Sequence, residues 1–155
     1  MEVRKATIKD LKKIQELNKA LFDEEFDLYD DTLNVDWPLG KSGGEVFRKL
    51  LTSKDNCVFV AEVETEVVGY LAGGEIDEGD FRTVRRIGQL KNMFVLSEYR
   101  GKGSGRGLYD AFAQWCKGRG VKRVKVEASA GNDVAALFYE GVGLGKFGIV
   151  LEGDL

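Results

Sequence analysis

The segment "YRGKGSGRGLYDAFAQWC", residues 99–116, constrains this chain more than any other stretch of its sequence. Four glycines alternate with polar residues over Gly101–Gly107, and the apolar residues after them repeat at helical spacing. The first turn of a helix carries unpaired N–H groups and a partial positive charge, so it attracts anions such as phosphate. Glycines lack the Cβ atoms that would keep an anion away from these amides. The segment predicts a phosphate site where a strand ending at Val95 turns into a helix.

Two common phosphate-binding fingerprints do not fit this segment. The dinucleotide pattern G-x-G-x-x-G fails because Arg106 or Leu108 stands where its third glycine is required. The P-loop pattern G-x-x-x-x-G-K-[ST] fails because Leu96 occupies the place of its first glycine. The pattern that does fit is R-x-x-G-x-G, from Arg100 to Gly105.

Composition favours an ordinary globular protein. The 155 residues suit one domain spanning 1–155, with 43% hydrophobic and 32% charged residues. The net charge of −3 argues against a dedicated nucleic-acid binder. No apolar run is long enough to span a bilayer, so no membrane association is expected. The charged start "MEVRKATIKDLKKIQ" does not resemble a secretory signal, which predicts a cytoplasmic location.

The chain contains no histidine. Its absence excludes Ser-His-Asp and Cys-His catalysis, histidine-ligated zinc and any histidine general base. Cys57 and Cys116 lie far apart and form no CxxC pair, so both are expected in the core and no metal is expected. Proton transfer in an enzyme of this composition falls to carboxylates, tyrosine, lysine or water.

Hydrophobic periodicity and turn residues predict a mixed α/β domain with the order β-α-α-β-β-β-α-β-α-β. Strands are expected at 2–7, 57–63, 66–76, 85–95, 121–129 and 147–155. Helices are expected from a Thr7–Asp10 capping box to about Phe22, at about 45–53, from the glycines to 118–120, and at 132–143.

A second motif lies about 30 residues after the glycine segment, in "VKVEASAGNDVAALFYEGVGL". It places Glu127 on a strand, Asn132 at the start of a helix, Tyr139 seven residues later and then Gly143. Together with R-x-x-G-x-G, this resembles the GNAT superfamily of N-acetyltransferases. The resemblance implies a mostly antiparallel twisted sheet flanked by helices, with acetyl-CoA as co-substrate in a central cleft and an amine that attacks the thioester directly.

The resemblance also implies how backbone amides hold the coenzyme. In this family the strand before the loop splays from its neighbour, so one amide of Met93, Phe94 or Val95 would polarise the acetyl carbonyl. Side chains buried in a strand are the simpler reading of the same residues, and both can hold. The pyrophosphate loop begins at Arg100, and its cradling amides are those of Gly101, Lys102, Gly103, Ser104, Gly105 and Arg106.

Three side chains match functional positions of the family. Asn132 matches the residue that contacts the pantetheine arm, although an N-cap explains it equally well. Tyr139 matches the general acid that protonates the leaving thiolate, with packing beside Phe138 as the alternative. Glu127 is the candidate base for the amine, or else a solvated carboxylate among lysines. Gln89 stands where histone-type members carry their glutamate, and an amide cannot act as a base.

Residues 23–36 carry seven acids and no base, at the place where relatives join their first two helices beside the acceptor site. Such a surface would attract a cationic amine, on a small molecule or a peptide, whereas a solvated loop is the alternative. The basic residues between Lys117 and Lys125 meet coenzyme phosphates or are simply solvated. Dimers are common among relatives, so a homodimer is one expectation.

Two other function classes remain open at this stage. One is a non-catalytic acyl-CoA-binding sensor or scaffold, which the presence of Tyr139 disfavours. The other is a binder of a different phosphate ligand, such as a nucleotide. Thiol release in the presence of amines distinguishes the first from an enzyme, and thermal shifts with acetyl-CoA, NAD and ATP distinguish the second.

Overall fold

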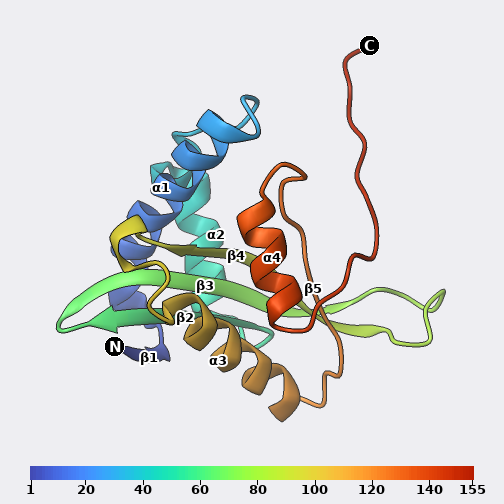
Figure 1. The fold of residues 1–155 in the computed structure, drawn as a ribbon. Coiled ribbons are helices and arrows are strands. Elements are labelled where there is room, and N and C mark those ends of the chain that lie inside the picture. Colours follow the sequence, from blue (N-terminus) through green and yellow to red (C-terminus); the bar gives the residue numbers. More distant parts are fainter.

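The computed structural model describes residues 1–155 and contains a five-stranded mixed sheet flanked by helices (Figure 1). The strands lie side by side in chain order, β1-β2-β3-β4-β5. Neighbouring strands are antiparallel from β1 to β4, whereas β5 runs parallel to β4. The predicted fold class is confirmed. The strand bounds are β1 Glu2–Lys5, β2 Asn56–Val63, β3 Glu66–Asp77, β4 Arg86–Val95 and β5 Val124–Val126.

Helices cover both faces of this sheet. Their bounds are α1 Leu11–Leu28, α2 Lys41–Thr52, α3 Ser104–Gly118 and α4 Asp133–Gly141. One buried cluster joins α1 and α2 to the sheet through residues such as Ile14, Phe47 and Tyr70. The other joins α3 to the opposite face through Leu108 and Phe112, with side chains of α4 packed against it. No helix is both long and apolar enough to cross a membrane.

Several predicted elements are confirmed. The β2–β3 hairpin turns at Glu64, whose φ of 59° is the left-handed conformation that a tight turn requires. The Asp10 carboxylate accepts a 2.8 Å hydrogen bond from the Thr7 amide, as expected of a capping residue at the start of the first helical segment. Cys57 and Cys116 are free and buried, as expected.

The predicted end of the first helix near Phe22 is wrong, because α1 continues to Leu28. Its last turns carry acids, which are unfavourable at a helix C-terminus. Neighbouring groups offset this cost: Lys19 pairs with Asp23, and Glu24 and Glu25 bind groups from distant loops. Tertiary contacts therefore extend the helix beyond the point that its sequence suggests.

The start of the second helix also differs from the prediction, since α2 begins at Lys41 instead of residue 45. Glycine costs about 1 kcal/mol relative to alanine inside a helix, so Gly43 is unfavourable for a helix that begins this early. In the structure a Cβ at Gly43 would lie 2.3 Å from the carbonyl oxygen of Trp37. Close packing on the preceding turn requires glycine at this position.

The last two predicted strands are shorter or absent. β5 contains three residues instead of the nine expected over 121–129. Residues 147–155 are extended but belong to no sheet, so the predicted final strand is wrong for this chain. An extended segment becomes a strand only where it finds a hydrogen-bonding partner, and this segment runs away from the sheet (Figure 1).

Candidate functional site

Two glycines of the loop before α3 adopt conformations that other residues avoid. Gly101 has a φ of 72°, and Gly103, the N-cap of α3, has a φ of 89°. A Cβ at either position would meet nothing within 4 Å. The two glycines are therefore required by the backbone path, and the space in front of them is open.

This path leaves a run of amides without partners. The first α3 amide that bonds to the backbone is that of Gly107, which donates to the Gly103 carbonyl at 2.9 Å. None of the six amides before it donates a well-formed hydrogen bond within the protein, and no acid stands in the first turn of α3. Consecutive free amides at a helix start form an anion-binding concavity. These amides belong to Gly101, Lys102, Gly103, Ser104, Gly105 and Arg106, the six residues predicted from the sequence.

The cations around this loop play different parts. Lys102 is exposed and lies over the Tyr99 ring, with its Nζ 5.7 Å from the ring centroid. Arg106 pairs with Asp110 one turn further along α3, at 2.9 Å. Lys102 therefore adds unpaired positive charge beside the free amides, whereas Asp110 partly offsets the charge of Arg106.

The Arg100 side chain binds groups outside the glycine loop. Its Nε donates to the Val95 carbonyl at 2.7 Å, and its terminal nitrogens donate to the Glu24 carboxylate at 2.7 and 3.1 Å. Its own amide donates to Ser97. Arg100 therefore ties the loop to α1 and β4, and the coenzyme contact predicted for it stays a prediction.

β4 and β5 separate in front of the loop. Their ladder ends at the pair Leu90–Val126, whereas β4 continues to Val95. The Leu96 amide donates to the Val68 carbonyl of β3 at 2.9 Å, and the direction of strand amides alternates. Alternation turns the Phe94 amide toward β3, and the amides of Met93 and Val95 toward the side that β5 has left. The register thus favours Met93 and Val95 over Phe94 as donors to a ligand.

Tyr139 lies on α4 and packs against the α3-side cluster, next to Phe138. Burial, with a smaller contribution from the neighbouring Tyr109 phenol, raises the pKa of Tyr139 to about 12. Its hydroxyl makes no hydrogen bond within the protein and is not enclosed, since the Asn18 amide oxygen is the only buried side-chain polar atom without a partner. Tyr139 can therefore hold and donate a proton at neutral pH.

Glu127 follows β5 directly, is exposed and makes no ion pair. The nearby Lys125 binds Glu78 instead, so Glu127 is not a carboxylate paired with its neighbouring lysine. Val126, the last residue of β5, packs against the α3-side cluster, and Glu127, one residue beyond the strand, lines a groove between α3, α4 and β5.

One groove connects several of these groups. It has a volume of about 1160 Å³ and runs between α3, α4 and β5. Arg106 lies at its end beside the glycine loop, and both Tyr139 and Glu127 line it. The fold thus brings together residues 21 and 33 positions apart from Arg106 in the sequence.

Asn132 caps α4, as the simpler of its two predicted roles requires. Its Oδ1 accepts from the Ala135 amide at 3.0 Å, and its Nδ2 donates to Glu25 at 3.4 Å. The Ser129 hydroxyl donates to the same Glu25 carboxylate at 2.6 Å. The end of α1 therefore holds the β5–α4 loop through Glu25, just as it holds the glycine loop through Glu24.

These two carboxylates are the site-forming residues that the sequence did not single out. They belong to the acidic stretch 23–36, which was predicted as a loop beside the acceptor. Their partners lie 76 and 104 residues away, and no local pattern indicates such contacts. Because Asp23 is paired as well, three of the seven acids neutralise or bind neighbours, and the attraction for a cationic ligand is weaker than the composition suggests.

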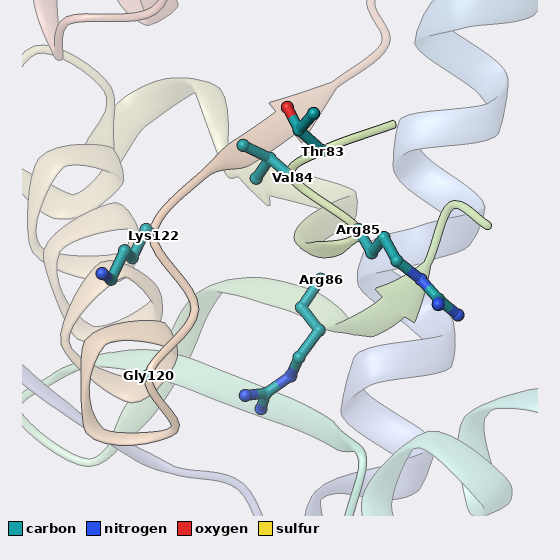
Figure 2. Close-up of a pocket in the computed structure, with 6 residues that line it drawn as sticks. All are labelled: Thr83, Val84, Arg85, Arg86, Gly120 and Lys122. Carbon is teal, nitrogen blue, oxygen red and sulfur yellow. The ribbon is translucent and has the colours of Figure 1, made fainter. Parts of the chain in front are cut away.

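A second, smaller pocket of about 440 Å³ lies where the loop between β3 and β4 leads into β4 (Figure 2). Arg85, Arg86 and Lys122 line it, but Figure 2 shows their side chains pointing in different directions. Arg85 pairs with Asp77, and Arg86 with Glu75. These cations do not converge on a common point, so the pocket is a poor anion site.

Comparisons with known proteins agree with this geometry. The model of the acetyltransferase (GNAT) family matches residues 12–144. Human N-acetyltransferase 8 is 28% identical over 114 residues, which cover 74% of this chain and 49% of that protein. The chain therefore spans about half the length of the curated relatives that it matches first.

Solved structures share the fold. The BH1408 protein of Bacillus halodurans, determined as a tetramutant, superposes with a TM-score of 0.88 at 18% identity, covering all of both chains. The aminoglycoside N-acetyltransferase AAC(6')-Iy in complex with CoA gives a TM-score of 0.78 at 18% identity, covering 99% of this chain and 93% of that one. At these identities the likeness shows the fold alone.

Proposed function

This chain belongs to the GNAT family of acetyltransferases, and on that premise we propose that it transfers an acetyl group from acetyl-CoA to a primary amine. The observation that carries the proposal is the run of six partnerless amides from Gly101 to Arg106. They supply the donors that a pyrophosphate needs, at the start of a helix whose dipole favours negative charge. The solved complex of AAC(6')-Iy with CoA supports the same ligand class for this fold.

We propose that coenzyme binding uses the separation of β4 and β5. The pyrophosphate binds the loop amides, with Lys102 and Arg106 adding positive charge. The acyl-bearing arm then runs along the free side of β4, where the amides of Met93 and Val95 face it. Asn132 keeps its hydrogen bond with the Ala135 amide and so positions the start of α4 beside this arm.

In the reaction the amine nitrogen attacks the acetyl carbonyl carbon, the new C–N bond forms and the C–S bond breaks. The β4 amide nearest the acetyl oxygen stabilises the negative charge that develops there, an effect typically worth about 3 kcal/mol per donor. Tyr139 donates its proton to the departing sulfur, because its raised pKa of about 12 keeps the phenol protonated at neutral pH. Glu127, directly or through water, accepts the proton that the amine must lose.

The acceptor proposed here is a small molecule or a peptide with a primary amine. Aminoglycoside acetylation by the structural neighbour AAC(6')-Iy supports a cationic amine. The acids of 23–36 that remain without strong partners, such as Asp27 and Asp31, lie beside the α1 end and suit the same charge. The acceptor amine then approaches Glu127, which lines the groove beside β5.

The decisive experiment combines coenzyme binding with turnover. We expect acetyl-CoA to raise the melting temperature, NAD and ATP to leave it unchanged, and at least one amine of a panel to release free thiol from acetyl-CoA. Binding without thiol release for any polyamine, aminoglycoside or lysine peptide would support a non-catalytic acyl-CoA sensor. No stabilisation by acetyl-CoA would overturn the proposal altogether.

Glu127→Gln tests the proposed base. We expect kcat/KM at neutral pH to fall about 10- to 100-fold, within the usual range for loss of a general base. The loss should shrink at high pH, because the amine then deprotonates without help. Glu140→Gln, another carboxylate lining the groove, is the matched control and should leave the pH–rate profile unchanged. If Glu127→Gln leaves the pH–rate profile unaltered, the proton of the acceptor amine is taken by water and not by Glu127.

A further inference from the structure

The Val95 carbonyl lies at the end of β4, on the side that β5 has left. The N–H and the C=O of one strand residue point to the same side, so this carbonyl faces the same opening as the Val95 amide. No strand pairs with it there, because the β4–β5 ladder ends at Leu90. Val95 is buried, and a buried carbonyl without a hydrogen-bond donor is costly. A side chain must therefore provide the donor.

Arg100 provides it. Its Nε donates to the Val95 carbonyl at 2.7 Å. The N–H of the same peptide unit belongs to Leu96 and donates to the Val68 carbonyl of β3 at 2.9 Å. Both ends of the peptide unit that follows Val95 are therefore held. The residue before Val95 is held as well, since the guanidinium lies over the Phe94 ring, with its central carbon 5.1 Å from the ring centroid.

The terminal nitrogens of Arg100 bind α1. They donate to the two oxygens of the Glu24 carboxylate at 3.1 and 2.7 Å, and such a bidentate pair fixes the plane of the guanidinium. Lysine cannot replace it, because an ammonium group has no planar fork. The two side chains are 41% and 37% exposed, so the pair contributes little to stability. Its main effect is on the orientation of Arg100 toward β4.

The end of α1 that carries Glu24 is itself anchored. The Glu25 carboxylate accepts from the Ser129 hydroxyl at 2.6 Å and from the Asn132 Nδ2 at 3.4 Å. Because these partners belong to the β5–α4 loop, one helix end is attached to both sides of the opening between β4 and β5. Glu24 therefore holds Arg100 from a fixed position.

On the basis of the proposed function, we propose that Arg100, oriented by Glu24, is a positioning residue for acetyl transfer. It holds the end of β4, and with it the amides of Met93 and Val95, in the direction that binds the acyl-bearing arm of the coenzyme. Arg100 acts through Val95 and touches neither reacting atom. The alternative is a direct contact of the guanidinium with a coenzyme phosphate, which would require it to leave Glu24.

Hydrogen exchange of the chain without coenzyme tests the geometry. In Arg100→Met, which keeps an unbranched stem but donates no hydrogen bond, the Leu96 amide should exchange about ten-fold faster. Glu24→Gln should accelerate this exchange less, because the bond from Nε to β4 remains. Arg85→Met is the matched control, since Arg85 forms an exposed bidentate pair with Asp77 and its loss should leave Leu96 unchanged. An unchanged Leu96 rate in Arg100→Met would overturn the proposal.

Turnover with an amine that releases thiol tests the effect on the reaction. Arg100→Met and Arg100→Lys should both lower kcat about 10- to 100-fold, the usual cost of misplacing reacting groups by up to about 1 Å. The dissociation constant of CoA should stay within about three-fold of the wild-type value, because the loop amides still bind the pyrophosphate. Arg85→Met should keep the wild-type kcat. A purely structural loss would lower the melting temperature and leave kcat per folded molecule unchanged.

Glu24→Gln separates positioning from a direct phosphate contact. If Arg100 positions β4, Glu24→Gln lowers kcat, leaves CoA affinity unchanged and has little further effect in Arg100→Met, because both residues act through one link. Tighter CoA binding in Glu24→Gln, CoA binding at least about ten-fold weaker in Arg100→Met, or full kcat in Arg100→Lys would each overturn the proposal. A wild-type chain that releases no thiol with any amine overturns the proposed function instead, and the Leu96 exchange rate then decides by itself whether Arg100 holds β4.

Discussion

Replacing both Gly101 and Gly103 with alanine should weaken binding of CoA by about 30- to 700-fold, while the protein remains folded. Each glycine holds a left-handed conformation, which costs other residues roughly 1–2 kcal/mol. Two such costs amount to about 2–4 kcal/mol, and every 1.4 kcal/mol is a factor of ten in affinity. The loop is exposed at these positions, and a Cβ there would meet nothing within 4 Å. The alanine variant can therefore adopt another loop conformation, in which the amides no longer point to one common anion.

Three further variants, Gly118→Ala, Gly103→Asn and Gly103→Ala, separate the backbone effect from a general effect of glycine loss. Gly118→Ala lies in the last turn of the same helix, has no positive φ and meets nothing within 4 Å, so CoA binding should not change. Gly103→Asn introduces a residue that tolerates the left-handed region better than alanine does, so this variant should bind CoA more tightly than Gly103→Ala. Calorimetry on all four variants measures these differences. Equal affinities for the double variant and Gly118→Ala would remove the loop from the binding site.

The sequence predicts the loop because the whole signal is local. Free amides, positive φ and the start of α3 all depend on residues within a few positions of one another. The same holds for the β2–β3 hairpin and for Asn132, whose side chain caps the helix that it begins. In each case the interacting groups lie close together in the chain, so the residue pattern contains the physical cause.

The features that the sequence did not predict depend on distant partners. Arg100 is part of a coenzyme motif, yet its guanidinium binds Glu24, 76 residues away. The extension of α1 depends on the same contact and on the Glu25 contacts with Ser129 and Asn132. The final strand expected at 147–155 is the opposite case: its residues favour a strand, but in the structure they pair with no other strand. Contacts between residues far apart in the sequence therefore determine whether a segment adopts the helix or strand that its own residues favour.

Tyr139→Phe should lower kcat about 100- to 10,000-fold, the usual effect of removing a general acid, and should leave KM for acetyl-CoA nearly unchanged. The substitution removes only a hydroxyl that makes no hydrogen bond within the protein, so neither folding nor coenzyme affinity depends on it. Since the pKa of Tyr139 is raised to about 12, the wild-type enzyme should show no loss of activity from ionisation of this phenol at neutral or mildly alkaline pH.

Tyr109→Phe is the matched control for this prediction. Tyr109 lies in the same cluster, also lines the groove and has a pKa raised mainly by burial. If any buried phenol in the groove influenced the rate through packing or polarity, both variants would lose activity together. If Tyr139 donates the proton, only its own removal lowers kcat, whereas Tyr109→Phe changes stability at most. Steady-state thiol release by the two variants therefore separates proton donation from packing, and equal kcat values would show that the sulfur takes its proton from another donor.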